Sequence, residues 1–187
     1  MKHMVQKWNN NEMEIILQLL KGSKHLRAIA KEINEPHVTI LRRLNELVNK
    51  NVLDFKREGK NKIFFLKDNI ITKSYIYRAE HYKLEKLVNK YPEMMIIIED
   101  VLKKTKAELI ILFGSYVKFK AKKDSDIDIY IETGNRKVKK AISEINSNLS
   151  IKIGPFNLKS LLIKEMIDNH VIIRGVERFY SKKENLY

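Results

Sequence analysis

Four residues in the middle of the chain have the types and the spacing to bind a charged ligand. Gly114 and Ser115 follow an apolar run, and ten residues later Asp126 and Asp128 alternate with isoleucines. Residues two apart on a strand face the same side of a sheet, so the two carboxylates are expected to project together. They repel one another unless a cation lies between them, and carboxylate oxygens at this spacing suit Mg²⁺.

Two strands joined by a turn must position these residues. The apolar run 107–113 predicts the first strand, and residues 127–131 predict the second. Between them we expect a tight turn, a short helix and a loop, which would put Ser115 at a helix start. The alternative interpretation is a hairpin-like pair of strands with two solvated aspartates.

The motif of Gly114-Ser115, ten residues and Asp126-Ile127-Asp128 resembles the GS-x10-DxD signature of the nucleotidyltransferase superfamily, which includes DNA polymerase beta, kanamycin nucleotidyltransferase and the minimal prokaryotic nucleotidyltransferases. The resemblance implies transfer of a nucleoside monophosphate from a nucleoside triphosphate, ATP above all, to an acceptor. It also implies that Asp126 and Asp128 are catalytic and hold Mg²⁺, and that Gly114 and Ser115 bind the nucleotide. The intervening loop carries further cations that either add charge or are solvated: Lys118, Lys120, Lys122 and Lys123.

One part of the family pattern is missing from the sequence. Active members have a third carboxylate on the next strand, which is expected here at 149–153, and Lys152 occupies the expected position. A lysine there would pair with the two aspartates and displace a second metal ion. Glu132 and Glu144 are the candidate substitutes for the third carboxylate, but Glu132 is farther along its strand than Asp128 and Glu144 is on a helix. The sequence therefore fits both a catalytic site and a site that only binds Mg²⁺ and nucleotide.

The first third of the chain predicts a helix-turn-helix. Helices are expected at 11–21 and 25–33, and a third is expected to begin at Pro36. The third helix has an expected apolar stripe: Val38, Leu41, Leu44 and Leu47. Strands at 52–55 and 62–66 follow, joined by a basic turn that contains Gly59.

Residues 11–67 resemble the winged helix-turn-helix domains of prokaryotic regulators, and the resemblance implies DNA binding. The residues expected to face the major groove from the third helix are His37, Thr39, Arg42 and Arg43. Those expected to hold the flanking phosphate backbone are Lys56, Arg57, Lys60 and Lys62. The alternative is a winged helix used only for protein contacts or dimerisation.

Composition agrees with a polyanion-binding protein. The 187 residues carry a net charge of +14, of which +9 falls in residues 1–90 (19 basic, 10 acidic) and +5 in the rest (18 basic, 13 acidic). Such an excess favours nucleic acid, although a lysine-rich proteome also explains it. There is no cysteine, no apolar run near the roughly 20 residues of a membrane span and no leader-like start, so we expect a cytoplasmic protein without a membrane partner.

The expected fold class is α+β, with a winged helix-turn-helix at 1–70, a connector helix at 71–91 and a nucleotidyltransferase-like domain with a small mixed sheet at 92–187. Tyr75, Tyr77 and Tyr82 of the connector are suited to packing against the next domain or against a partner in a homodimer. Later helices are expected at 93–105, 136–148 and 157–168, and the segment 170–180 resembles the end of other nucleotidyltransferase-domain proteins.

Three functions fit these features. The first is a Mg²⁺-dependent nucleotidyltransferase with a nucleic-acid-binding winged helix. The second is a DNA-binding transcription regulator whose nucleotidyltransferase fold is weakly active or inactive and senses nucleotide or dimerises. The third is an antitoxin that adenylylates a HEPN-type toxin partner. Such antitoxins are usually shorter than this chain and lack a winged helix, which counts against this function.

Overall fold

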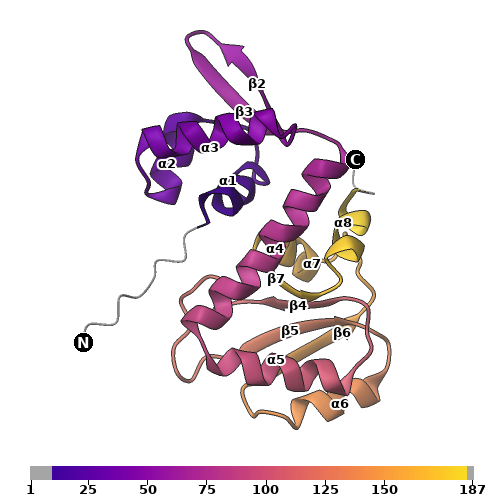
Figure 1. The fold of residues 1–187 in the computed structure, drawn as a ribbon. Helices are drawn as coiled ribbons and strands as arrows, with labels where there is room; N and C mark the ends of the chain where they lie inside the picture. Colours follow the sequence, from indigo (N-terminus) through magenta and orange to yellow (C-terminus); the bar gives the residue numbers. More distant parts are fainter. Residues whose placement is uncertain (1–9, 185–187) are drawn as a thin grey trace, which may run out of the picture. The chain divides into compact units, whose positions relative to one another are not determined.

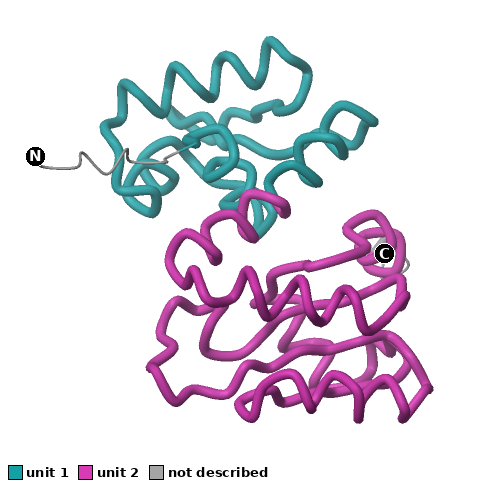
Figure 2. The backbone as a smooth tube through the Cα atoms, turned by 60° about the horizontal axis from the view of Figure 1, so that its bottom comes forward, with its two compact units in different colours: residues 1–79 teal, residues 80–187 magenta. Residues whose placement is uncertain are grey.

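The computed structural model describes residues 10–184, so the expected leader-free start at 1–9 and the last residues 185–187 lie outside the described part. The chain divides into two compact units, Met1–Ala79 and Glu80–Tyr187 (Figure 2). The division falls within the helix α4 (Ile70–Lys90), which was expected to be a connector. The domain limits 1–70, 71–91 and 92–187 stay a prediction.

Unit 1 begins with short helices whose ends are set by local hydrogen bonds (Figure 1). The side chain of Asn10 accepts a hydrogen bond from the amide of Met13, and that of His25 accepts one from the amide of Ala28, so both residues act as N-caps. Asn34 ends the second helix in a left-handed conformation with φ +58°. The elements are α1 (Asn11–Leu19), β1 (Lys24–His25), α2 (Leu26–Ile33) and α3 (His37–Asn49).

A β-hairpin completes unit 1. The strands β2 (Leu53–Glu58) and β3 (Asn61–Leu66) pair antiparallel, and β1 adds to β3 to give the order β1-β3-β2. The strands are longer and the turn shorter than expected, because Glu58 pairs with Asn61 and only Gly59 and Lys60 remain in the turn. Gly59 has φ +59°, which glycine adopts readily. A three-helix arrangement followed by this hairpin is a winged helix-turn-helix, as the sequence predicted.

The predicted stripe of α3 is partly wrong. Ile40, Leu44 and Leu47 are fully buried, whereas Val38 is 80% exposed and Leu41 is 39% exposed. Residues 40, 44 and 47 share one face of the helix, and residues 38, 41, 44 and 47 also fit one face. Helical spacing alone therefore could not decide which of the two sets is buried. The outer face of α3 therefore carries two apolar side chains.

Unit 2 is built on a mixed sheet of order β6-β5-β4-β7. β4 pairs antiparallel with β5 and β7, whereas β5 and β6 are parallel and are connected through α6. The elements that follow α4 are α5 (Glu93–Lys104), β4 (Ile110–Phe113), β5 (Ile127–Glu132), α6 (Arg136–Ser143), β6 (Leu149–Gly154), α7 (Leu161–Asp168), β7 (Val171–Arg174) and α8 (Val176–Glu184).

The alternation of side chains on β5 separates the two faces of this sheet. Ile127, Ile129 and Ile131 are buried in a core with apolar residues of α5 and α6. Asp128 and Tyr130 face the other side, where the Tyr130 ring meets that of Phe156 at 6.2 Å. Both faces of the sheet therefore bury apolar side chains, and Asp128 lies on the face of Tyr130, at the start of β5.

Three expected helices of unit 2 differ from the prediction. The helix expected at 157–168 begins only at Leu161, and the helix expected at 136–148 ends at Ser143. The short helix expected after Gly114 is absent, because residues 114–119 run as a series of turns. Within residues 10–184, none of the helices has the length and apolar character needed to cross a membrane.

Candidate functional site

Gly114 and Asp128 lie against each other at the end of β4. Phe113 pairs with Asp128 in the β4–β5 ladder, and Gly114 follows at once with φ +78°. A Cβ atom at Gly114 would overlap the Oδ2 atom of Asp128 and lie 3.2 Å from its Cγ atom. Both the backbone conformation and the nearby carboxylate therefore require glycine here.

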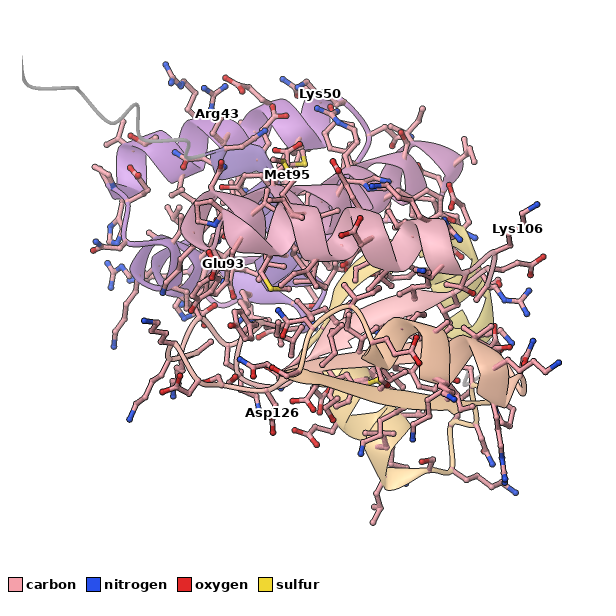
Figure 3. The ribbon with its side chains drawn as sticks, turned by 90° about the horizontal axis from the view of Figure 1, so that it is seen from below. Arg43, Lys50, Glu93, Met95, Lys106 and Asp126 are labelled. Atoms are coloured by element: carbon pink, nitrogen blue, oxygen red, sulfur yellow. The ribbon has the colours of Figure 1, made fainter. Side chains whose placement is uncertain are left out.

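Asp126 precedes β5 and is exposed, while Asp128 is half-buried. The buried Ile127 between them points into the core, so the two aspartates share the opposite side of the strand. Figure 3 shows the Asp126 side chain extending away from the ribbon. Among the described residues, neither carboxylate has an ion-pair or hydrogen-bond partner, although the chain has 37 basic residues.

Glu132 contrasts with these two carboxylates. The Glu132 carboxylate forms ion pairs with the Arg178 guanidinium at 2.6 Å and with the Lys182 ammonium at 2.9 Å. Burial alone raises the pKa of Glu132, but the hydrogen bonds from Lys182 and Arg178 outweigh it, so the pKa is lowered. Glu132 is thus an ion-pair partner of α8 at the far end of β5, which excludes it as the third carboxylate. Glu144 is exposed at the end of α6 and contributes nothing to the site either.

Ser150, rather than Lys152, lies beside Asp128. The parallel register aligns Asp128 with Ser150 and Tyr130 with Lys152. Lys152 is exposed and forms no ion pair with either aspartate in the described part of the chain, so the expected pairing of this lysine with Asp126 and Asp128 is wrong. Within residues 10–184 no three His, Cys, Asp or Glu side chains gather as a metal site.

The residues at this end of the sheet fit one Mg²⁺ ion. Two carboxylates without protein partners offer hard oxygen ligands, and Mg²⁺ commonly takes one or two carboxylates together with substrate phosphates. Asp126 and Asp128 would hold the ion. A second, fully protein-bound ion would need a further carboxylate, and Ser150 does not supply it.

The turn that follows Gly114 is closed by backbone hydrogen bonds. The amide of Phe119 donates to the Tyr116 carbonyl at 3.0 Å, and the amide of Lys120 donates to the Ser115 carbonyl at 3.1 Å. Phe119 has φ +55°, an unusual conformation for a bulky residue. Ser115 therefore begins a closed turn and not a regular helix, which corrects the expected helix start.

The loop lysines spread over different surroundings. Lys118 pairs with Glu165 of α7 at 3.4 Å. Lys122 and Lys123 line a cavity of about 410 Å³, together with Tyr91 and Asn148. That cavity also includes the core residue Ile127, so it opens on the other side of β5 from Asp128.

Sequence reasoning missed a buried polar cluster in unit 2. Glu80 is fully buried, and its Oε1 atom accepts a hydrogen bond from the Tyr180 hydroxyl at 2.7 Å. Its Oε2 atom lies 2.8 Å from the Lys83 ammonium and 3.3 Å from Nε2 of His170. Burial raises the pKa of Glu80, but the hydrogen bond from His170 and the charge of Lys83 outweigh it and lower the pKa to about 2. The available signal was a carboxylate beside Ala79 on the apolar side of α4.

In unit 1, the third helix presents the predicted DNA-facing residues unequally. His37 and Arg42 are exposed, whereas Thr39 and Arg43 are half-buried. Glu46 pairs with Arg43 at 2.7 Å and with Arg42 at 3.9 Å. The two arginines thus share one carboxylate.

On the wing, the basic residues surround the two-residue turn. Lys56, Arg57, Lys60 and Lys62 are all exposed. Lys56 pairs with Glu58 at 2.8 Å, and the Lys62 ammonium lies 4.0 Å from the Phe55 ring centre. Arg57 and Lys60 are the wing cations nearest the tip.

Fold and site together define a nucleotidyltransferase-type αβ unit that follows a winged helix. Residues 97–185 match the sequence model of the family described as "Polymerase beta, Nucleotidyltransferase". This part of the chain is therefore a nucleotidyltransferase domain of the polymerase beta type, which confirms the family predicted from the motif. No curated protein matches the chain.

Several solved structures are similar to parts of the chain. A possible transcriptional regulatory protein (fragment 1-100) from Mycobacterium bovis is 19% identical, with a TM-score of 0.34, over 36% of this chain and 73% of that one. The adhesin competence repressor from Streptococcus pyogenes is 18% identical, with a TM-score of 0.39, over 49% and 68% of the two chains. A toxin-antitoxin structure with AMP-PNP is 19% identical, with a TM-score of 0.34, over 57% and 85%.

Proposed function

We propose that this protein is a Mg²⁺-dependent nucleotidyltransferase, with ATP as the preferred donor, whose winged helix binds DNA. The observation that carries the proposal is the pair Asp126 and Asp128, which have no protein partners among the described residues, with Asp128 packed against Gly114, inside a domain that matches the polymerase beta family.

The chemistry follows from this arrangement. Gly114 leaves the backbone open to a phosphate group, and Ser115 offers its hydroxyl as a hydrogen-bond donor to that group. Asp126 and Asp128 would hold Mg²⁺, and the ion would supply charge neutralisation for the bound triphosphate. An acceptor hydroxyl oxygen forms a bond to the α-phosphorus, the bond from that phosphorus to the bridging oxygen breaks, and pyrophosphate leaves with the electron pair. The hydroxyl proton passes to water, since the residue aligned with Asp128 on β6 is Ser150 and not a carboxylate base.

Transfer is tested with α-labelled ATP. We expect the wild-type protein, incubated with Mg²⁺, labelled ATP and a cell extract, to label an acceptor, whether nucleic acid, small molecule, or protein such as a toxin partner. The double variant Asp126→Asn with Asp128→Asn should give no label. The control Asp100→Asn, which removes a carboxylate of α5 that pairs with Lys103, should leave labelling unchanged. Absence of label with each of the four α-labelled triphosphates would refute the transferase assignment.

A regulator that binds nucleotide without transferring it is the second candidate. The observation in its favour is the serine aligned with Asp128. In that case the wild-type protein binds MgATP, labels no acceptor, and changes its affinity for DNA or its oligomeric state when nucleotide is added. The two candidates are therefore separated by labelling and binding measured on the same preparation.

DNA binding is proposed from the exposed residues of α3 and the wing. Affinity for duplex DNA should fall steeply with salt, because phosphate contacts release counterions. Arg57→Gln with Lys60→Gln should weaken binding to all sequences and flatten the salt dependence, whereas Lys106→Gln in unit 2 should change neither. Binding that is insensitive to salt, or equal in both variants, would contradict a DNA-binding wing.

A further inference from the structure

The outer side of α6 carries a group of positive charges that the rest of unit 2 does not neutralise. The group, called here the α6 cations, consists of Arg136, Lys137, Lys139 and Lys140, and all four side chains are exposed. Within residues 10–184 none of the four forms an ion pair. The helix itself contains no acidic residue.

The other side of α6 packs against the core. Ile142 is fully buried and Val138 is half-buried against the isoleucine face of the sheet, where α6 lies beside α5 (Figure 1). With 3.6 residues per turn, Arg136 and Lys140 then lie on the side of the helix opposite these apolar residues, and the other two α6 cations flank them. Packing therefore fixes the direction in which the charges face.

This arrangement of charges is unfavourable for the helix alone. Arg136 and Lys140 are four positions apart, and Lys137 and Lys140 are three apart, so like charges repel one another on the helix surface. The first turn holds two of these cations and no acidic residue, although the helix dipole favours negative charge there. Helix stability therefore does not account for the α6 cations, and a bound polyanion would relieve their repulsion.

Neighbouring carboxylates leave these charges uncompensated. Glu144 follows Lys140 by four positions, a spacing that allows an ion pair on a helix, but the two form none in the described structure. Glu132, at the end of the strand before α6, and Glu108, before β4, are both bound by Arg178 of α8. The α6 cations are thus available to a partner outside the chain.

The α6 cations can hold a partner by charge alone. The centre of a protein interface is apolar, and none of the large exposed apolar side chains of residues 10–184 belongs to α6. A helix that lies on a membrane inserts its apolar side, whereas that of α6 is used in the core. Arginine and lysine bind a phosphate backbone without apolar contacts, and duplex DNA offers about one negative charge per 1.7 Å of its axis.

We propose that the α6 cations form a second DNA-binding surface, on unit 2, which contacts the phosphate backbone and does not read the base sequence. This surface is separate from α3 and the wing, and it depends neither on the proposed transfer reaction nor on DNA binding by the wing. Because its contacts are with phosphates, its affinity falls as the salt concentration rises.

The test is the binding of labelled random-sequence duplex DNA, measured by fluorescence anisotropy over a range of salt concentrations. The full chain is used with the wing substitutions Arg57→Gln and Lys60→Gln, and it should retain salt-dependent binding. Adding Arg136→Gln with Lys140→Gln should lower the affinity at low salt by about tenfold and reduce the slope of log affinity against log salt by about 2. Arg136→Lys with Lys140→Arg keeps both charges and should change the affinity and the slope little.

The matched control is Lys159→Gln with Lys164→Gln in the same background. It removes the same amount of charge from two exposed lysines, one before α7 and one within it, and should leave both the affinity and the slope unchanged. The temperature of thermal unfolding of Arg136→Gln with Lys140→Gln should not fall, because the change removes a like-charge pair. A loss of DNA binding is then separated from a loss of fold.

Three results would overturn the inference. They are the absence of DNA binding at low salt in the wing variant, an unchanged slope when Arg136 and Lys140 are replaced, and equal losses in that variant and its control, which would indicate an effect of net charge. Binding to phosphatidylserine vesicles that requires Arg136 and Lys140, without such a requirement for DNA, would also overturn it. The DNA-binding wing is judged by a different comparison, that of the wild type with the wing variant.

Discussion

Replacing Glu80 with glutamine should destabilise the protein by an amount that depends on pH. Glu80 is fully buried between Lys83, His170 and Tyr180, and its pKa is about 2 in the folded protein against 4.5 for the free side chain. That difference corresponds to about 3 kcal/mol of folding free energy. Because the folded-state pKa is the lower one, the stabilisation is complete above about pH 4.5 and is lost as the pH falls towards 2.

Urea unfolding followed by circular dichroism at a series of pH values tests this expectation. At pH 7 Glu80→Gln should lower the free energy of unfolding by about 3 kcal/mol, and near pH 2 the difference from wild type should largely disappear. Glu85→Gln, an exposed glutamate of the same helix, is the matched control and should change the free energy little at either pH. A Glu80→Gln loss that is equal at pH 7 and pH 2 would refute the assignment of the stabilisation to the ionised carboxylate.

Two further predictions concern the site and the recognition helix. Gly114→Ala should abolish MgATP binding in calorimetry, because its Cβ atom would displace the Asp128 carboxylate, while Gly134→Ala, with open space around it, should bind normally; unchanged binding in both would contradict the close packing. Leu44→Ala should lower the free energy of unfolding by about 2–5 kcal/mol, whereas Leu41→Ala on the exposed side of α3 should cost less than about 1 kcal/mol, and equal losses would contradict the observed burial.

The central motif could be recognised from the sequence because its determinants are local. Alternation along a strand depends only on the residues themselves, so the shared side of Asp126 and Asp128 follows from their spacing. The family motif identified Gly114 as a nucleotide-binding residue, whereas the carboxylate of Asp128, which leaves no room for a Cβ atom there, comes from the pairing of β4 with β5. The motif thus identified the site residues, and the pairing of β4 with β5 explains why position 114 is a glycine.

Features set by pairing between distant segments were predicted less well. The alignment of Ser150 with Asp128 depends on the length of the connection through α6, and a shift of two residues along β6 would have placed Lys152 there instead. The contacts of Lys90 with Phe119 likewise join segments 29 positions apart. Periodicity within one segment carries no information about either arrangement.

The same limit explains the error on α3. Spacings of three and four residues connect Val38 with Leu41 and Leu44, and they connect Ile40 with Leu44 and Leu47 equally well. Only the packing of unit 1 decides that Ile40 is buried and Val38 is exposed. The exposure of an apolar residue on the outer face of α3 is thus set by tertiary packing and cannot be predicted from helical spacing.

The most direct test of the proposed site is the dependence of ATP binding on Mg²⁺ and on Asp128. Calorimetry of the full chain with ATP should show binding in the presence of Mg²⁺ and much weaker binding in EDTA. In Asp128→Asn the affinity with Mg²⁺ should fall to the value that the wild type has in EDTA. Binding that is equal with and without Mg²⁺, or that survives Asp128→Asn unchanged, would contradict a metal-nucleotide site at this end of the sheet.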